Sequence, residues 1–85
     1  MKNLLEIKLG TYAYIDGISN LASTKIKRRL LDLGFTKGQK VRCVHKSMLG
    51  KDFLLELRHF TLSLRGEIVK YILVKSVGEK WYKLI

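Results

Sequence analysis

The stretch RRLLDLGFTKGQKV, residues 28–41, changes from helical to strand-like spacing within a few residues and constrains the fold more than any other part of the chain. Ile26, Leu30 and Leu33 recur at the spacing of one apolar helix face. This pattern predicts a helix of about three turns over 24–33.

Local signals mark both ends of this helix. Ser23 or Thr24 can accept a hydrogen bond from the first free amides of the helix. Gly34 stands where a left-handed glycine commonly ends a helix, which would bring Phe35 back against Leu30. The helix therefore ends by a specific backbone conformation, and the chain turns sharply afterwards.

The residues after the helix are typical of a strand. We expect a second glycine, Gly38, to turn the chain into a strand that carries Val41, Cys43 and His45 on one face. Earlier in the chain, TYAYIDGI alternates apolar residues until Gly17, where we expect a β-bulge.

The second half of the chain predicts β-hairpins. Apolar residues alternate over 53–57 and again over 60–64 with the opposite parity, so a two-residue turn at Arg58 and His59 must separate them. Such a turn needs positive φ, which histidine tolerates better than most residues. The whole pattern predicts a mainly β fold, a strongly bent antiparallel barrel with one helix and strands at 11–18, 40–47, 53–58, 60–65 and 71–74.

Charge is the strongest compositional signal. The 85 residues hold 17 Lys and Arg against 7 Asp and Glu, a formal charge of +10, and no acid lies between Asp32 and Asp52. Such a charge favours nucleic acid, an anionic membrane surface or an acidic protein as partner. The alternative is a solvated basic face that keeps a small domain in solution.

Several classes are disfavoured by composition. With a single cysteine the chain forms no internal disulfide, which fits a reducing compartment. The N-terminal MKNLLEIKLG places Glu6 and Lys8 where a signal peptide needs an apolar core. The longest apolar run, YILV, is far shorter than the roughly 18–20 residues that cross a bilayer. We expect a soluble, cytoplasmic protein.

The candidate chemistry is sparse. GFTKGQK lacks the glycine spacing, the Ser or Thr and the following helix of a phosphate-binding loop. No paired carboxylates or activated nucleophile can be recognised, so we predict no enzyme.

A metal site is the remaining chemical candidate. Cys43 and His45 lie two residues apart on a predicted strand and should share a face, and His59 could approach them. However, Cys43 also continues the apolar face of Val41, and cysteine is among the residue types most often buried. We therefore predict no stoichiometric metal or cofactor, with a transition metal such as Fe²⁺ as the alternative.

Three segments together resemble the FeoA family of small ferrous-iron transport proteins: RRLLDLGFTKGQKV, then LG at 49–50, then FTLSLRGEIVKYILV at 60–74. The resemblance implies an SH3-like β-barrel with five or six strands and an inserted helix. It also implies a cytoplasmic accessory to FeoB, the membrane ferrous-iron transporter with a G-protein domain, and a relation to an interaction domain of some iron-dependent repressors. The positions that match the family signature are Arg29, Leu30, Leu33, Gly34, Gly38, Leu62, Leu64, Arg65, Glu67 and Ile72.

The chain departs from the family pattern at three places and at its end. Lys51 and Asp52 replace a common Asp-Pro, His59 replaces a common glycine, and Lys37 replaces a common proline. We divide the chain into a barrel domain, 1–74, and a C-terminal extension, 75–85, whose Trp81 and Tyr82 would pack on the barrel or serve a partner.

Two functional classes follow from these observations. The first is a non-catalytic interaction module that acts on the transporter, with Lys25 and Arg28 of the basic helix facing an acidic partner or anionic lipid headgroups. Arg29 belongs to the family signature and would also brace the fold. The second is a barrel that binds nucleic acid. We expect the aromatic residues to point mostly inward, which argues against this class because single-strand binders need exposed aromatic rings for base stacking. A metalloregulatory interaction module is a further alternative, and the first class is our prediction.

Overall fold

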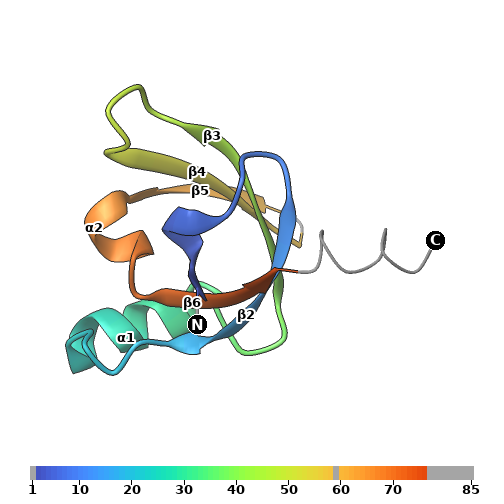
Figure 1. Cartoon of the computed structure of the whole chain (residues 1–85). Coiled ribbons are helices and arrows are strands. Elements are labelled where there is room, and N and C mark those ends of the chain that lie inside the picture. Colours follow the sequence, from blue (N-terminus) through green and yellow to red (C-terminus); the bar gives the residue numbers. More distant parts are fainter. Residues whose placement is uncertain (1, 59, 77–85) are drawn as a thin grey trace.

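The computed structural model describes residues 2–58 and 60–76. Its strands form one six-stranded antiparallel sheet in the order β1-β6-β2-β3-β4-β5, curled into a barrel (Figure 1). The mainly β class predicted from the sequence is confirmed. The elements are β1 (Lys2–Asn3), the 3-10 helix η1 (Leu4–Glu6), β2 (Tyr12–Ile18), α1 (Thr24–Asp32), β3 (Lys40–Lys46), β4 (Asp52–Leu57), β5 (Phe60–Arg65), α2 (Gly66–Val69) and β6 (Ile72–Ser76).

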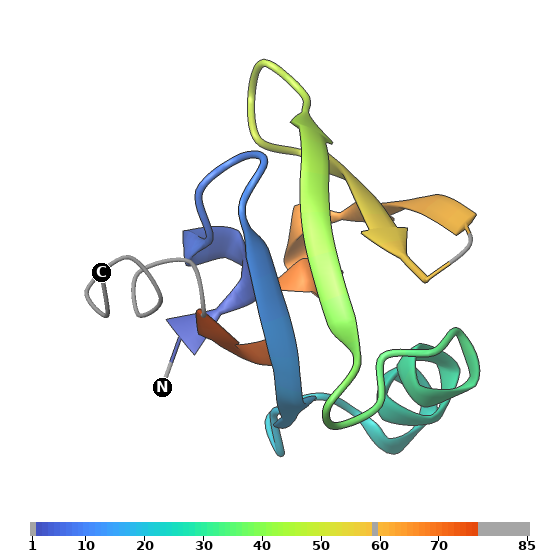
Figure 2. The ribbon, with the colours of Figure 1, turned by 90° about the vertical axis from the view of Figure 1, so that its right-hand side faces the viewer.

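The core lies inside the curled sheet, closed by the short helices η1 and α2. It forms because apolar residues occupy alternate positions of β2, β3 and β4, so that one face of the sheet is apolar. Helix α1 contributes one fully buried side chain, Leu30, and lies against one side of the barrel, at the lower right of Figure 2. The buried apolar residues are Leu4, Ile7, Ala13, Ile15, Leu30, Phe35, Val41, Cys43, Phe53, Leu55, Leu57, Val69, Ile72 and Val74.

The predicted ends of α1 are confirmed. The Ser23 hydroxyl oxygen accepts a hydrogen bond from the amide of Ile26 at 3.2 Å. At the other end Gly34 has φ of 109° and donates to the carbonyl of Leu31 at 3.1 Å. This is the hydrogen-bond pattern of a Schellman motif, in which left-handed glycine lets the chain reverse direction.

The bulge expected at Gly17 is also confirmed. The pairing of β2 with β6 shifts register between Ile15 and Gly17, where φ is 143°. The hairpin between β4 and β5 has the predicted two-residue turn, because Leu57 pairs with Phe60. Among the described residues only glycines have positive φ, so Arg58 does not take the positive φ expected of this turn; His59 lies outside the described residues.

The expectation that Cys43 and His45 share a face is wrong. Cys43 pairs with Leu55 but His45 pairs with the next residue along, Leu54, because the register of β3 and β4 shifts between them. The bulge at Val44 turns the His45 side chain out of the buried face, and His45 is exposed.

Strand β6 continues to Ser76, beyond the predicted 71–74. The predicted extension, 75–85, with Trp81 and Tyr82, lies mostly outside the described residues, so its packing stays a prediction. In the described part of the chain, no helix has the length and apolar character to cross a membrane.

Candidate functional groove

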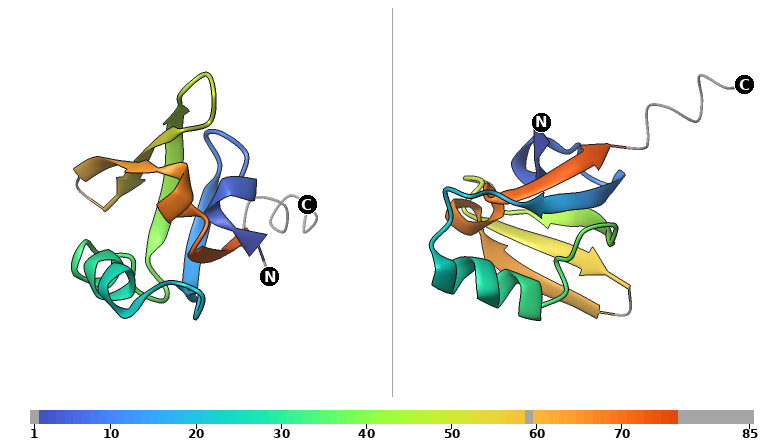
Figure 3. Two further views of the ribbon diagram at one scale, coloured as in Figure 1. Left: turned by 90° about the vertical axis from the view of Figure 1, so that its left-hand side faces the viewer. Right: turned by 90° about the horizontal axis from the view of Figure 1, so that it is seen from below.

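A groove of about 270 Å³ lies between α1 and the β5–α2 segment. The two views of Figure 3 show α1 running beside β5 at one side of the barrel. Five of the ten signature positions line this groove, three from α1 and its C-terminal cap and two from β5, and the two sets are more than 30 residues apart in the sequence. The lining residues are Ile26, Arg29, Leu30, Leu33, Ser63, Leu64, Arg65 and Ile68.

The groove stays open because β5 is the edge strand of the sheet. In the described residues β5 pairs only with β4, and none of its side chains is fully buried. The barrel therefore covers only part of the apolar stripe of α1. Leu30 is buried, whereas Ile26 and Leu33 are half-buried. An unpaired strand edge beside an apolar groove is suited to an extended peptide that adds to the sheet.

The rim of this groove is cationic. Arg29 and Arg65 flank the apolar floor, and no acidic residue belongs to the lining. Arg65 reaches Glu67 at 3.8 Å, but both side chains are largely exposed, so this ion pair is weak. Lys25 lies four residues before Arg29, hence on the same side of the helix, and like Arg28 it is exposed and has no ion pair within residues 2–58 and 60–76.

The two signature glycines serve the backbone instead of lining the groove. Gly34 ends α1, and Gly38, with φ of 90°, turns the chain into β3 while its amide donates to the carbonyl of Ile15 at 2.7 Å. Sequence analysis did not single out Ser63 and Ile68, which complete the lining. Only the pairing of β5 and the position of α2 reveal them.

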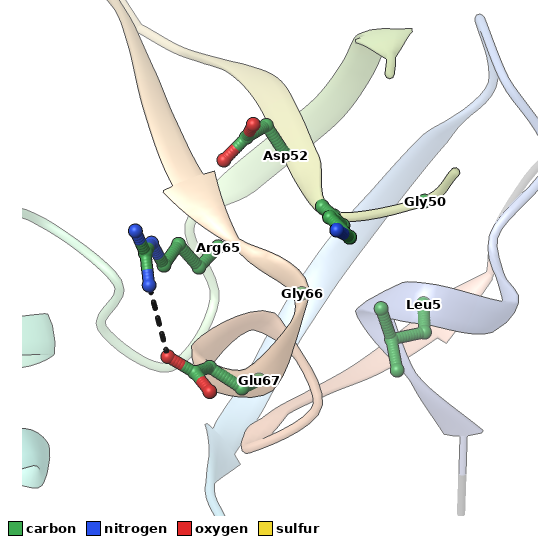
Figure 4. A pocket seen from close by; sticks show the side chains of 7 residues that line it. Leu5, Gly50, Asp52, Arg65, Gly66 and Glu67 are labelled. Carbon is green, nitrogen blue, oxygen red and sulfur yellow. Dashed lines mark ion pairs between the residues drawn. The ribbon is translucent and has the colours of Figure 1, made fainter. Parts of the chain in front are cut away.

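A larger and more open hollow of about 540 Å³ lies where β5 meets α2 (Figure 4). It is lined by the side chains of Leu5, Lys51, Asp52, Arg65 and Glu67 and by the backbone at Gly50 and Gly66. The amide of Gly66 donates to the carbonyl of Lys51 at 2.8 Å, and a Cβ at position 66 would lie 2.9 Å from the carbonyl oxygen of Gly50. Because these contacts seat the 47–51 loop on the barrel, we assign this hollow a structural role. Arg65 contributes to both the hollow and the groove.

The predicted metal candidates are not brought together. Cys43 is fully buried, and its Sγ donates to the carbonyl of His45 at 3.4 Å. Burial raises the pKa of the Cys43 thiol, which disfavours the thiolate that would ligate a metal. His45 is exposed beyond the bulge, and His59 lies outside the described residues. Within the described ranges, no three His, Cys, Asp or Glu side chains group as metal ligands.

The expectation that aromatic residues point mostly inward is wrong for half of those described. Tyr12 and Tyr14 alternate with buried Ala13 on β2 and therefore face solvent, as does Phe60 at the start of β5. The Lys40 ammonium lies 4.0 Å from the centre of the Tyr12 ring. This cation covers the ring that a nucleic-acid base would otherwise stack on.

The family model of the FeoA domain matches residues 2–76, almost the whole described structure. This chain belongs to the FeoA family. The comparison with curated proteins gives no match.

Solved FeoA structures agree with this assignment. FeoA from Stenotrophomonas maltophilia, crystallised with zinc, is 32% identical with a TM-score of 0.79, covering 88% of this chain and 91% of that one. A FeoA-like protein from Clostridium acetobutylicum is 29% identical with a TM-score of 0.78, covering 88% of this chain and 85% of that one. The Stenotrophomonas protein is described as an SH3 domain protein and a candidate activating factor for bacterial ferrous iron transport.

The same fold occurs in a larger regulator. A manganese-dependent transcriptional repressor shares 17% identity with a TM-score of 0.78, covering 88% of this chain but only 41% of the repressor. This likeness concerns the fold alone. The SH3-like architecture expected from the resemblance is confirmed by the match to the Stenotrophomonas protein.

Proposed function

We propose that this FeoA chain is a non-catalytic accessory protein of ferrous iron transport that binds the cytoplasmic part of a FeoB-type transporter. The observation that carries the proposal is the convergence of Arg29, Leu30, Leu33, Leu64 and Arg65 on one groove. Signature residues that serve only the core would be buried, yet Arg29 and Arg65 are exposed on the rim of the groove. Exposed residues of this kind are better explained by binding than by packing.

The groove indicates the chemistry of the bound segment. Its apolar floor favours aliphatic or aromatic side chains, and its two arginines favour an acidic side chain or a terminal carboxylate. The free edge of β5 can donate and accept backbone hydrogen bonds along that segment. A short extended peptide with apolar residues and an acid therefore fits the site.

The test is a pull-down of the full chain with the cytoplasmic domain of the matching transporter, together with ferrous iron uptake in a strain that lacks the gene. Leu64→Gln should weaken association because Leu64 lines the groove. Leu62→Gln is the matched control, since Leu62 is half-buried on the same face of β5 but does not line the groove. Normal uptake in the deletion strain, with no association at micromolar concentrations, would refute the proposal.

A second candidate function is nucleic-acid binding, which the formal charge of +10 and the exposed cation Lys40 on β3 favour. However, Lys40 already covers the Tyr12 ring, and Arg42 is half-buried and paired with Glu56 at 2.9 Å. Binding that fades steeply with salt would reflect only the charge of +10. Sequence-selective binding that persists at physiological salt would instead make this the leading function.

A further inference from the structure

The loop between β3 and β4 ends in two adjacent apolar side chains that nothing in the fold covers. Met48 is 100% exposed and Leu49 is 77% exposed. Single exposed apolar residues are common on protein surfaces. Two neighbours at the outermost point of a loop are less common, and the core gains nothing from either of them.

This loop is held in a defined shape. The amide of Gly50 donates to the carbonyl of Ser47 at 2.9 Å, which closes a four-residue turn with Met48 and Leu49 at its centre. The Ser47 hydroxyl oxygen also accepts from the amides of Lys51 and Asp52, each at 3.0 Å. The two apolar side chains are therefore presented by an ordered turn.

The residues at the centre of this turn are not the ones that turns favour. Asn, Asp, Gly and Ser stabilise such positions through side-chain hydrogen bonds or free φ, and Met and Leu offer neither. Neither local conformation nor packing explains Met48 and Leu49. A residue choice that breaks a local rule without a structural gain indicates a functional site.

The surroundings of the tip are basic. Exposed Lys51 follows the turn, whereas Lys46 before it is half-buried and its ammonium donates to the carbonyl of Ile7 at 3.4 Å. Exposed Lys8 lies on the neighbouring 8–11 turn, which is tied to β3 by the bond from the amide of Gly10 to the carbonyl of Cys43 at 2.9 Å. Figure 2 shows both turns at the same end of the barrel. The acidic residue Asp52 is also exposed here, leaving an excess of positive charge.

We infer that the Met48–Leu49 tip inserts into the interface of an anionic lipid bilayer. A protruding apolar turn with the exposed Lys8 and Lys51 nearby fits a deformable, negatively charged surface, because the apolar side chains enter the acyl boundary while the ammonium groups remain among the headgroups. Leu9, 52% exposed on the neighbouring turn, would add to the inserted surface.

This orientation leaves the groove accessible. Helix α1 lies at the opposite end of the barrel from the 47–51 loop in Figures 1 and 2. A molecule docked by the tip would therefore present Lys25 and Arg28 away from the membrane. The inference extends beyond the transporter interaction and requires no transporter to test.

The test is flotation of the full chain with vesicles of phosphatidylglycerol and phosphatidylethanolamine, and with vesicles of phosphatidylcholine, at physiological ionic strength. We expect binding to the anionic vesicles only, reduced about ten-fold by Met48→Ser with Leu49→Ser because the inserted apolar area is lost. Leu21→Ser removes a leucine that is 86% exposed, more than Leu49, from the loop before α1 and should change binding by less than about two-fold.

Two double variants with the same change in net charge show which end of the barrel contacts the vesicle. Lys8→Glu with Lys51→Glu should weaken vesicle binding more than Lys25→Glu with Arg28→Glu, although both pairs change the net charge equally. The inference is overturned if the parent does not bind anionic vesicles, if the serine variant binds like the parent, or if the two charge pairs act equally. It is also overturned if the serine variant loses association with the transporter domain but keeps vesicle binding, since the tip would then be a protein contact.

Discussion

The amide nitrogen of Phe35 lies 3.0 Å from the carbonyl oxygen of Leu30, and both side chains are almost completely buried. This bond spans Gly34 and joins the last turn of α1 to the segment that leads into β3. The groove depends on it, because the position of Leu30 and Leu33 beside β5 is fixed by where the helix ends. The same joint therefore supports both the core and the candidate binding surface.

Gly34→Val should destabilise the fold. At φ of 109° a β-branched residue is strained by about 1–2 kcal/mol or more. Space is not the cause, because a Cβ at this position meets only Leu57 Cδ1 at 3.7 Å, an ordinary contact. Chemical denaturation measures the free energy of unfolding. Gly34→Asn should lower this free energy less than Gly34→Val does, because asparagine tolerates positive φ better than valine. Equal stability of Gly34→Val and the parent would contradict the assignment of the helix end.

Gly66→Ala tests a different constraint, the close approach of the 47–51 loop. The new Cβ would lie 2.9 Å from the backbone oxygen of Gly50, so we expect a loss of about 1–3 kcal/mol from overpacking. Without this contact the change would stabilise the first turn of α2, because alanine loses less backbone entropy than glycine in a helix. The sign of the change in thermal stability therefore decides whether the loop is seated as described.

Cys43 should make stability depend on pH in the alkaline range. Burial raises the pKa of its thiol, so the folded state favours the neutral form. This contribution is complete below the thiol pKa of the unfolded chain, about 8.5, and is lost as pH rises through the higher pKa of the folded state. The parent should therefore lose stability relative to Cys43→Val between pH 7 and pH 10. A difference that is constant over this range would contradict the buried, neutral thiol.

Much of the fold was predictable because its signals are local. The serine cap, the glycine that ends α1 and the change of parity before Phe60 each act within a few residues. Strand β1 has only two residues, Lys2 and Asn3, and is defined by pairing with β6, which no local pattern reveals. The capping box of η1, formed by Asn3 and Glu6, was readable from its Asn-x-x-Glu spacing but was missed.

The candidate site was predictable in its residues but not in its arrangement. The family resemblance named Arg29 and Leu64, yet only the edge position of β5 brings them to one groove. The prediction that His45 shares a face with Cys43 was wrong because it also depended on how neighbouring strands pair. A bulge is set by pairing with the neighbouring strand, so alternation within β3 cannot show it.

The last prediction concerns the basic face of α1. Lys25→Glu with Arg28→Glu should weaken association with the transporter domain about five-fold or more at low salt, because reversed charges at an interface rim slow encounter and repel an acidic partner. Folding should be little affected, within about 0.5 kcal/mol, since both side chains are exposed and lie off the apolar stripe. Binding kinetics at two salt concentrations measure the effect.

The matched control for this pair is Lys8→Glu with Lys51→Glu at the opposite end of the barrel, which changes the net charge by the same amount. If the α1 pair alone slows association, and does so less at high salt, the helix face forms part of the interface. Equal slowing by both pairs would show that only the overall charge attracts the partner, and the assignment of Lys25 and Arg28 to the binding surface would fail.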